Sequence, residues 1–218
     1  MDWFEHFDGY CERTDFTYWS EPLNALTNAS FIIAAILMWT RVSHLFWGRV
    51  LCVVLFAIGV GSYLFHTHAT AWAALADVAP IGIFILVYLF VVNRHMVGWP
   101  LWAALIGTLG FAPFAAGVTL ALDPVPFFGI SNFYWSVPIL LLAYAAIYRR
   151  QMPATARGFV IGAAILSLSI TLRSLDMPLC DVFPVGTHIF WHILNGVMLA
   201  WMIEVYRRHT VEAPRPNA

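Results

Sequence analysis

The sequence predicts an all-α integral membrane protein, a seven-transmembrane-helix bundle with its N-terminus outside and its C-terminus in the cytoplasm. Of the 218 residues, 61% are hydrophobic and 11% are charged, and the mean hydropathy is +0.77. Soluble domains have about 25% charged residues, so this composition excludes a soluble globular domain, a disordered chain and a nucleic-acid-binding protein. A transmembrane helix needs about 20 mostly apolar residues, and the chain is long enough for seven of them.

Seven apolar stretches follow one another along the chain, and residues typical of loops separate them. The stretches are Leu23–Thr40, Val50–Phe65, Thr70–Val92, Trp99–Leu122, Phe128–Tyr148, Gly158–Leu172 and Thr187–Tyr206. The second and sixth are short, which suggests tilted or partly shielded helices. We expect one membrane domain over residues 1–218, with an acidic extracytoplasmic segment at 1–22 and a cytoplasmic tail at 207–218.

The distribution of arginine predicts the orientation, because the chain contains no lysine. If the first stretch runs from outside to inside, nine arginines fall in the inner loops and the tail: Arg41, Arg49, Arg94, Arg149, Arg150, Arg157, Arg207, Arg208 and Arg215. Only Arg13 and Arg173 fall outside, which is a strong positive-inside pattern. We therefore expect a multi-pass protein whose acidic N-terminal segment faces the periplasm, lumen or exterior.

Two of the three cysteines fall on the predicted outer side. Cys11 lies in the N-terminal segment and Cys180 in the loop between the sixth and seventh stretches, whereas Cys52 lies inside an apolar stretch and is expected to be buried. A Cys11–Cys180 disulfide would hold the acidic segment against the bundle in an oxidising compartment. Two free thiols stay the alternative, because the sequence does not give their distance.

Ionisable residues inside the apolar stretches are the main functional signal, since such groups are costly at membrane depth and usually have a function. His66 ends the second stretch, Asp77 lies in the first part of the third, and His188 and His192 begin the seventh. With the N-terminus outside, all four lie at a similar depth in the outer half of the membrane. They are therefore candidates for one site.

The spacing of these residues favours a metal site. His188 and His192 are four residues apart and share one helix face, a spacing by which helices bind zinc. Ser62 and His66 have the same spacing, which places a hydroxyl on the face of the third imidazole. Three histidines and an open position are typical of catalytic zinc, and Asp77 is then the carboxylate available to shuttle a proton.

Other interpretations stay open at this point. A histidine in a membrane helix is more often a hydrogen-bonded interior residue than a ligand, and a histidine pair can also bind haem. Asp77 alone is compatible with a proton relay or with an ion pair to Arg173. The combination of three histidines, an aspartate and a serine at one depth favours the zinc site.

The complete motif resembles the alkaline ceramidase family, part of a seven-span hydrolase superfamily that includes the progestin and adiponectin receptors. The resemblance rests on Ser62-Tyr63-Leu64-Phe65-His66, on Asp77 eleven residues after His66, and on His188-x-x-x-His192. Further segments resemble the family in the same order along the chain: Tyr10-Cys11-Glu12, Glu21-Pro22-Leu23-Asn24, and Arg173-Ser174-Leu175-Asp176 ahead of Cys180.

The resemblance implies a role for each residue of the buried site. His66, His188 and His192 would hold zinc. Asp77 would act as the proton shuttle, and Ser62 would orient or stabilise the reacting oxygens.

The resemblance also implies a calcium site in the N-terminal segment, built from carboxylates and backbone oxygens. Glu12 and Glu21 match the family pattern, whereas Asp8 lies one residue further from the Tyr-Cys-Glu core than the pattern expects. Thr14 stands where an amide ligand would be, and Asp15 is the available substitute. Calcium prefers six to eight oxygen ligands, and a solvated acidic segment stays the alternative.

The expected function is that of a zinc-dependent intramembrane amidohydrolase. It would cleave the amide bond of ceramide or a similar N-acyl lipid to a fatty acid and a sphingoid base or amine, with its active site toward the extracytoplasmic side. The expected ions are Zn²⁺ and, unless the acidic segment is simply solvated, Ca²⁺. The expected partner is a membrane lipid, and no obligate protein partner is indicated. The alternatives are a receptor-like signalling protein with a structural zinc, and a His-ligated haem or proton-translocating membrane protein.

Overall fold

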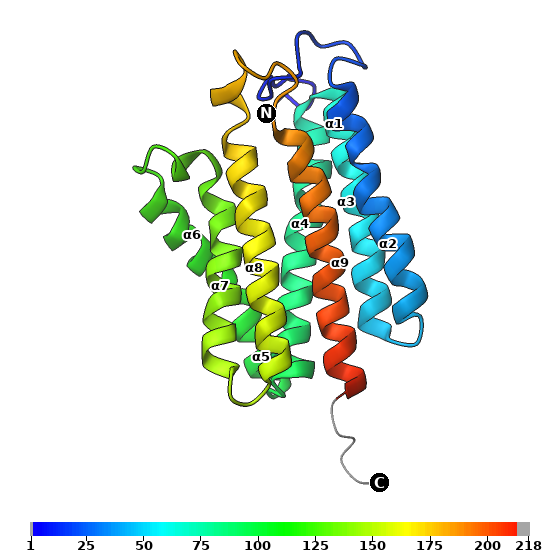
Figure 1. The fold of residues 1–218 in the computed structure, drawn as a ribbon, viewed down its shortest axis with the longest axis vertical. Helices are drawn as coiled ribbons and strands as arrows, with labels where there is room; N and C mark the ends of the chain where they lie inside the picture. The colour runs from blue at the N-terminus through cyan, green and yellow to red at the C-terminus, as the bar shows by residue number, and fades with distance from the viewer. Residues whose placement is uncertain (1, 213–218) are drawn as a thin grey trace.

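The structure is a computed structural model that describes residues 2–212. Figure 1 shows a bundle of helices that run roughly along one direction, with the N-terminal segment over one end. Part of the expected cytoplasmic tail, residues 213–218 with Arg215, lies outside the described residues. Within residues 2–212 the regular structure is helical, apart from an isolated backbone bridge between His6 and Thr70.

The helices confirm the predicted fold class. In chain order they are α1 (Pro22–Thr27), α2 (Ala29–Val42), α3 (Phe46–His68), α4 (Ala71–Val91), η1 (Val92–Met96), α5 (Leu101–Leu109), α6 (Phe111–Leu122), η2 (Phe128–Ser131), α7 (Asn132–Tyr148), α8 (Pro153–Ser174), η3 (Met177–Leu179) and α9 (His188–Glu212). Among the described residues, seven helical segments are long and apolar enough to cross a membrane. They are formed by α1–α2, α3, α4–η1, α5–α6, η2–α7, α8 and α9.

The second and sixth spans are longer than their apolar stretches suggested. They cover Phe46–His68 and Pro153–Ser174, with 23 and 22 residues, so neither is a short helix. Arg49 and Arg157 lie within these helices, each directly before the first residue of the predicted apolar stretch. An arginine near a helix end can lay its aliphatic stem along the helix while its charge reaches the interface.

The fourth span is interrupted at Gly110, between α5 and α6. Pro113, the third residue of α6, has no N–H to donate to the carbonyl of Leu109, as a continuous helix would require. Figure 1 shows α6 leaning away from the other helices, and it packs mainly on α7. This span is 17% buried against 56% for α9, so α5–α6 is peripheral.

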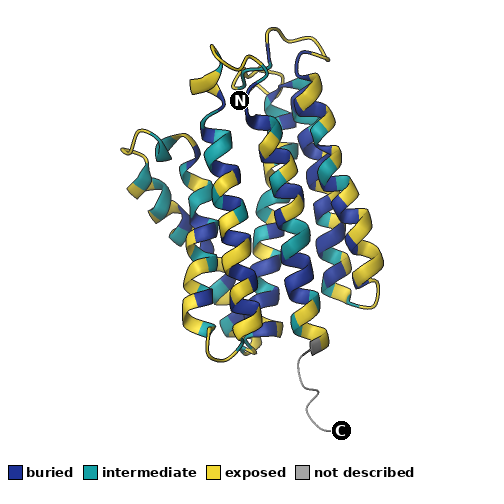
Figure 2. Cartoon of the chain, viewed as in Figure 1, coloured by how far each residue is buried: buried dark blue, intermediate teal, exposed yellow. Residues whose placement is uncertain are grey.

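Helix α9 lies inside the bundle, where it packs against α8, α2 and α3. Its buried residues recur every three or four positions and include His188, Trp191, His192, Asn195 and Met198, which is one face of a helix. Figure 2 shows that the buried surfaces of the helices face the interior. The face of α9 that forms the core therefore also presents the two histidines at its N-terminal end.

A disulfide holds the N-terminal segment to the end of the bundle that carries the histidines. Cys11 and Cys180 are bonded, with their Cα atoms 5.4 Å apart, which confirms that prediction. The N–H of Cys11 donates to Oδ2 of Asp176 at 3.0 Å. Gly186 has a φ of 74°, and a Cβ there would lie 2.2 Å from Oδ1 of Asp176. Only glycine lets the loop before α9 come this close to Asp176.

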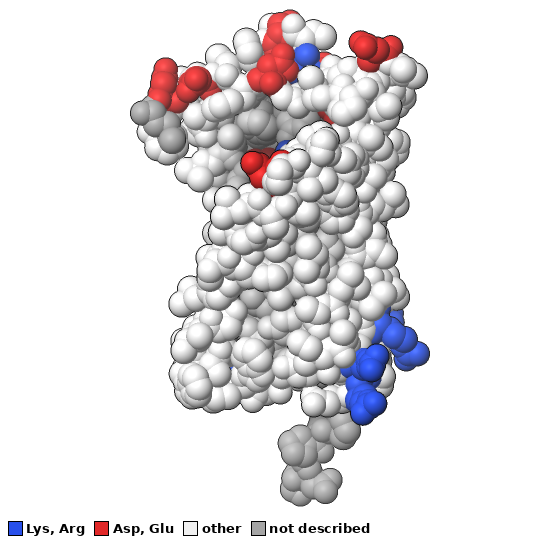
Figure 3. Space-filling model, turned by 90° about the vertical axis from the view of Figure 1, so that its left-hand side faces the viewer, with Lys and Arg blue, Asp and Glu red and all other residues white. Residues whose placement is uncertain are grey.

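Charge is distributed unevenly between the two ends of the bundle. On the side seen in Figure 3, acidic side chains gather at one end and arginines lie mostly at the other. At the arginine-rich end, Glu204 forms ion pairs with Arg41, Arg207 and Arg208 at 2.8–3.1 Å. This asymmetry agrees with the sequence pattern, and the membrane side that each end faces stays a prediction.

Candidate metal centre

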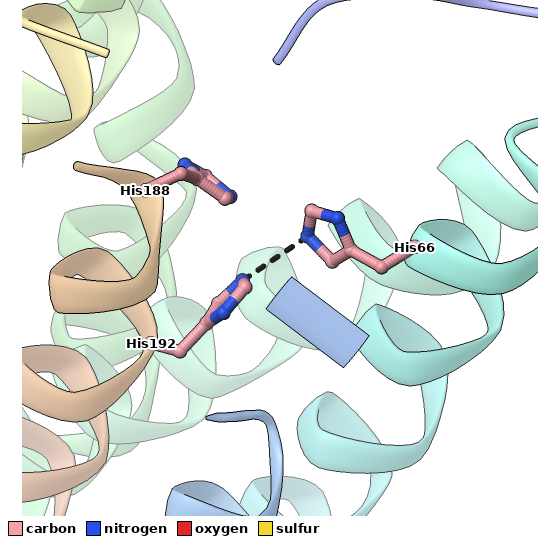
Figure 4. A group of neighbouring side chains, drawn as sticks. All are labelled: His66, His188 and His192. Atoms are coloured by element: carbon pink, nitrogen blue, oxygen red, sulfur yellow. Dashed lines mark hydrogen bonds between the residues drawn. The ribbon is translucent and has the colours of Figure 1, made fainter. Parts of the chain in front are cut away.

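Three histidines meet beneath the N-terminal segment (Figure 4). One ring nitrogen from each of His66, His188 and His192 lies within 4.8 Å of the others. Their exposed fractions are 2% or less. Among the residues that the structure describes, this is the one group of three His, Cys, Asp or Glu side chains arranged so that they could hold a metal ion. The structure thus brings together the three side chains that the sequence predicted as ligands.

Helices α3 and α9 present these histidines from opposite sides of the site. His66 lies in the last turn of α3, which ends where Ala69 adopts the left-handed conformation with φ 47°. His188 is the first residue of α9, and its N–H donates to Oδ1 of Asp176 at 2.8 Å. A carboxylate at this position stabilises a helix N-terminus. His192 lies one turn further along the same face.

A buried carboxylate fixes the ring of His66. Oε2 of Glu21 lies 2.6 Å from Nδ1 of His66 and accepts a hydrogen bond from Nδ2 of Asn24 at 3.0 Å. Oε1 of Glu21 pairs with Nε of Arg13. Burial raises the pKa of Glu21, but the hydrogen bond and charge of His66 and the charge of Arg13 outweigh it, so the pKa lies below its usual value. The ionised carboxylate can only accept, so Nδ1 of His66 donates.

A threonine fixes the ring of His192 in the same way. Oγ1 of Thr27 donates to the backbone carbonyls of Leu23 and Asn24, at 2.8 and 3.1 Å. The same oxygen lies 2.8 Å from Nδ1 of His192. Since the hydroxyl proton is directed to the backbone, the oxygen accepts and Nδ1 of His192 donates.

A metal ion fits between these rings. In their neutral forms both rings carry the proton on Nδ1, so two bare Nε2 atoms, from His66 and His192, face each other at 3.1 Å (dashed line in Figure 4). Two lone pairs repel at this distance unless a proton or a metal ion lies between them. Two nitrogens bound to one tetrahedral zinc at about 2.0–2.1 Å lie about 3.3 Å apart, close to the observed distance. His188 adds a third imidazole, and its buried Nδ1 has no hydrogen-bond partner among the described residues.

Ser62 and Asp77 lie next to the histidines. The side chains of Ser62 and His66 both lie close enough to the carboxyl of Asp77 to interact with it electrostatically. Gly61 makes this contact possible, because a Cβ there would lie 2.0 Å from the backbone oxygen of Ala76. The glycine thus lets α3 and α4 approach each other at the turn that carries Ser62 and Asp77. Asp77 is not part of the three-residue ligand group.

The sequence analysis did not place Tyr10 and Arg173 in this site. The ring of Tyr10 stacks on His188, with centroids 3.9 Å apart, and its hydroxyl interacts electrostatically with Arg173. Arg173 also lies over the rings of Tyr134 and Trp191. Burial raises the pKa of Tyr10 to about 12, with Asp77 adding to this effect and Arg173 opposing it. The available signal was that Arg173 directly follows the outer end of the sixth predicted span, close to the depth of the histidines.

The carboxylates assigned to calcium have other partners. Glu12 accepts hydrogen bonds from the N–H groups of Leu23 and Asn24 at 2.7 and 2.8 Å. Burial raises the pKa of Glu12, and these bonds partly offset the rise. Glu21 pairs with Arg13 and His66, and the remaining two carboxylates, Asp8 and Asp15, are exposed. The Asp15 carboxylate accepts two bonds from Thr17, which lower its pKa. The structure therefore does not gather these four carboxylates around one point.

Apolar cavities lie in the bundle next to the candidate site. One of about 40 Å³ is lined by Trp191, Tyr134 and Phe31. A second, of about 70 Å³, shares Phe84 and Met198 with the first and extends further along α9. Figure 3 also shows the surface hollowed near the acidic end. The apolar linings suit a hydrocarbon chain.

Comparison with known proteins identifies one family. The family model described as Ceramidase matches residues 9–217, nearly the whole chain. The match includes all seven candidate spans and the three histidines. A comparison with curated proteins gives no match.

Proposed function

Since the chain belongs to the ceramidase family, we propose that it is a zinc-dependent intramembrane amidohydrolase. Its substrate is ceramide or a similar N-acyl lipid, which it cleaves to a fatty acid and a sphingoid base or amine. The observation that carries the proposal is the pair of bare Nε2 atoms of His66 and His192 beside His188. A buried set of three converging imidazoles is typical of catalytic zinc.

In this proposal His66, His188 and His192 hold the metal. A bound zinc ion polarises a carbonyl and lowers the pKa of bound water to about 7. Glu21 and Thr27 hold two of the rings in the tautomer that leaves Nε2 free. Such partners of metal ligands fix ring orientation and raise ligand basicity.

Three converging imidazoles argue against the haem alternative. A porphyrin occupies four positions around its iron and leaves only two opposite positions for protein ligands. Here three ring nitrogens lie within 4.8 Å of one another, which leaves no room for a macrocycle between them. This geometry favours a small ion.

Asp77 is the general base and acid of the proposed reaction. Its carboxylate takes a proton from the attacking water, whose oxygen forms the new bond to the amide carbon. The proton then goes to the nitrogen as the carbon–nitrogen bond breaks, so one water is consumed and an amine and a fatty acid leave. Ser62 lies beside the carboxyl of Asp77 and interacts with it. The presence of this pair favours a hydrolase over a receptor with a structural zinc.

Tyr10 and Arg173 supply hydrogen-bond donors at the same site. Because the pKa of Tyr10 is raised to about 12, its hydroxyl keeps its proton in neutral and mildly alkaline conditions. It can therefore donate to an oxygen of the substrate. Arg173 is held by Ser131 and by two aromatic rings, which orients its guanidinium beside Tyr10.

The apolar cavities and the position of α6 suit a lipid substrate. The cavity at Trp191 and Phe31 and its neighbour along α9 are lined by apolar side chains, which suits contact with part of a hydrocarbon chain. Helix α6 leans away from the bundle at the end that holds the histidines. In the proposal, the lipid enters there sideways from the membrane.

Metal analysis and an assay of the purified protein test the proposal. We expect a colourless protein with about one zinc per chain that releases fatty acid from ceramide, loses this activity on zinc removal and regains it on zinc addition. His192→Ala should lose both metal and turnover. The matched control is His209→Ala, a histidine near the opposite end of α9 that pairs with Thr155, and it should keep both. Full zinc content in His192→Ala, or no hydrolysis of any N-acyl lipid by the zinc-loaded protein, would contradict the proposal.

A further inference from the structure

Arg13 is buried where the resemblance led us to expect calcium. Its side chain is 1% exposed. Nε pairs with Oε1 of Glu21, Nη1 donates to the backbone oxygen of Asp15 at 2.9 Å, and Nη2 donates to the backbone oxygen of His66 at 3.0 Å. The guanidinium thus binds one carboxylate and two carbonyls, the kinds of oxygen that calcium prefers.

The other expected ligands do not complete a calcium site around these oxygens. The carboxylate of Glu12 binds the N–H groups of Leu23 and Asn24 instead. At position 14 the side chain is a threonine, and its N–H, like that of Asp15, binds the hydroxyl of Ser20. The residues present fit an arginine and do not fit calcium.

We propose that Arg13 is the fixed cation of this cluster, so that the segment needs no calcium, and that Arg13 positions the ligand His66 through Glu21. This proposal rests on the metal-binding role of His66 in the proposed function. Arg13 is a positioning residue, because it contacts neither the substrate nor the metal.

The contacts from Arg13 through Glu21 to His66 explain how Arg13 positions this residue. Glu21 is 2% exposed, and a buried carboxylate without a cation is strongly unfavourable. With Arg13 in place, Oε1 of Glu21 has a cationic partner while Oε2 accepts from Nδ1 of His66. The second contact, from Nη2 of Arg13 to the backbone oxygen of His66, holds the same residue from its main chain. Arg13 therefore fixes both the ring partner and the backbone of one ligand.

Arginine suits this position better than lysine. The planar guanidinium directs its donors along several fixed directions, whereas the lysine ammonium is a compact charge on a flexible stem. Here three nitrogens of Arg13 bind three different residues. Arg13→Lys should keep the charge but lose part of the positioning.

The test measures zinc affinity by competition with a chromogenic chelator, in calcium-depleted buffer and with millimolar calcium. Wild-type protein should contain no calcium, and added calcium should change neither its zinc affinity nor its melting temperature. Arg13→Ala should bind zinc about 10- to 100-fold more weakly, the usual effect of losing a partner of a metal ligand, and Arg13→Lys should fall between. The control is Arg41→Ala, which removes an exposed arginine that pairs with Glu204 at the other end of the bundle, and it should leave zinc affinity unchanged.

The outcomes separate this proposal from the proposed function. Wild-type protein that binds no zinc would overturn the proposed function. Zinc-binding wild-type protein that retains calcium or responds to it would overturn the proposal on Arg13, whether or not the variants fold. An Arg13→Ala variant that keeps the wild-type zinc affinity would also overturn the proposal on Arg13.

Discussion

The Nε2 atoms of His66 and His192 face each other at 3.1 Å, although the two residues are 126 positions apart in the sequence. Hydrogen bonds to Glu21 and Thr27 direct the Nδ1 atoms of the same rings away from the site. A hydrogen bond at Nδ1 thus fixes each ring, so the two Nε2 atoms are oriented by contacts that involve no metal. Rings fixed in this way lose little freedom when an ion binds.

Thr27 should therefore matter for metal affinity although it does not touch the metal. Thr27→Val keeps the shape of the side chain but removes the hydroxyl that accepts from Nδ1 of His192. We expect zinc affinity to fall about 10-fold or more. Thr40→Val is the matched control, because the Thr40 hydroxyl binds only the backbone oxygen of Leu37 among the described contacts. Equal zinc affinities of the two variants in a chelator competition would mean that Thr27 does not orient His192.

Asp77→Asn should separate chemistry from metal binding. Asparagine keeps the size of the side chain and can still bond to Ser62, but it cannot accept the proton of the attacking water. We expect full zinc content and a turnover about 10²- to 10⁴-fold below wild type, the usual contribution of general acid–base catalysis. The measurements are metal analysis and fatty-acid release from ceramide. A near-wild-type rate would remove Asp77 from the proposed mechanism.

Gly61 sets the distance between α3 and α4 at the site. A Cβ at this position would lie 2.0 Å from the backbone oxygen of Ala76, so Gly61→Ala must push the two helices apart and move Ser62 from Asp77. We expect a destabilisation of about 1–3 kcal/mol, typical of overpacking, together with a loss of turnover. Gly82→Ala, on α4 but with nothing within 4 Å of its added Cβ, should change neither. Thermal melting and the hydrolysis assay test both variants.

Much of the fold and the three histidines could be predicted because they depend on local sequence. Length and hydropathy define a span by themselves, and depth in the membrane follows from distance to the span end. The interruption at Gly110 was missed because Pro113 lies inside a long apolar stretch. Hydropathy depends on how apolar the residues are and does not show that Pro113 lacks the N–H that a continuous helix needs. The lengths of α3 and α8 were underestimated because Arg49 and Arg157 lower hydropathy without ending a helix.

Contacts between the N-terminal segment and the bundle could not be predicted in this way. Glu12 and Glu21 were assigned to calcium because they match the family pattern, but the sequence does not tell whether the cation beside them is a metal ion or a side chain. Arg13 and Arg173 were treated as the two exceptions to the positive-inside pattern. In the structure Arg13 pairs with Glu21, which contacts His66, and Arg173 interacts electrostatically with Tyr10 beside His188. Both arginines on the predicted outer side thus lie next to the candidate metal centre.

The Cys11–Cys180 disulfide should contribute strongly to stability. It joins residues 169 positions apart, and closing so long a loop restricts the unfolded chain, an effect of about 2–5 kcal/mol for native disulfides. Cys11→Ser with Cys180→Ser, or a reducing agent on the wild type, should lower the melting temperature. The reducing agent should not affect the double variant further, and Cys52→Ala, at a buried free thiol, should keep the wild-type response to reduction. Equal melting with and without reductant would show that the bond contributes little.

The orientation in the membrane gives the last prediction, because it decides on which side the histidines lie. The loop after α2 contains the exposed His44, and the segment after α6 contains the exposed Asp123. The arginine pattern places His44 in the cytoplasm and Asp123 outside. A single cysteine introduced as Asp123→Cys should react with a membrane-impermeant maleimide on intact cells, whereas His44→Cys should react only after permeabilisation. The native free thiol is buried, so the background should be low. The reverse pattern would place the histidines, the disulfide and the acidic segment on the cytoplasmic side, where reduced thiols are the rule.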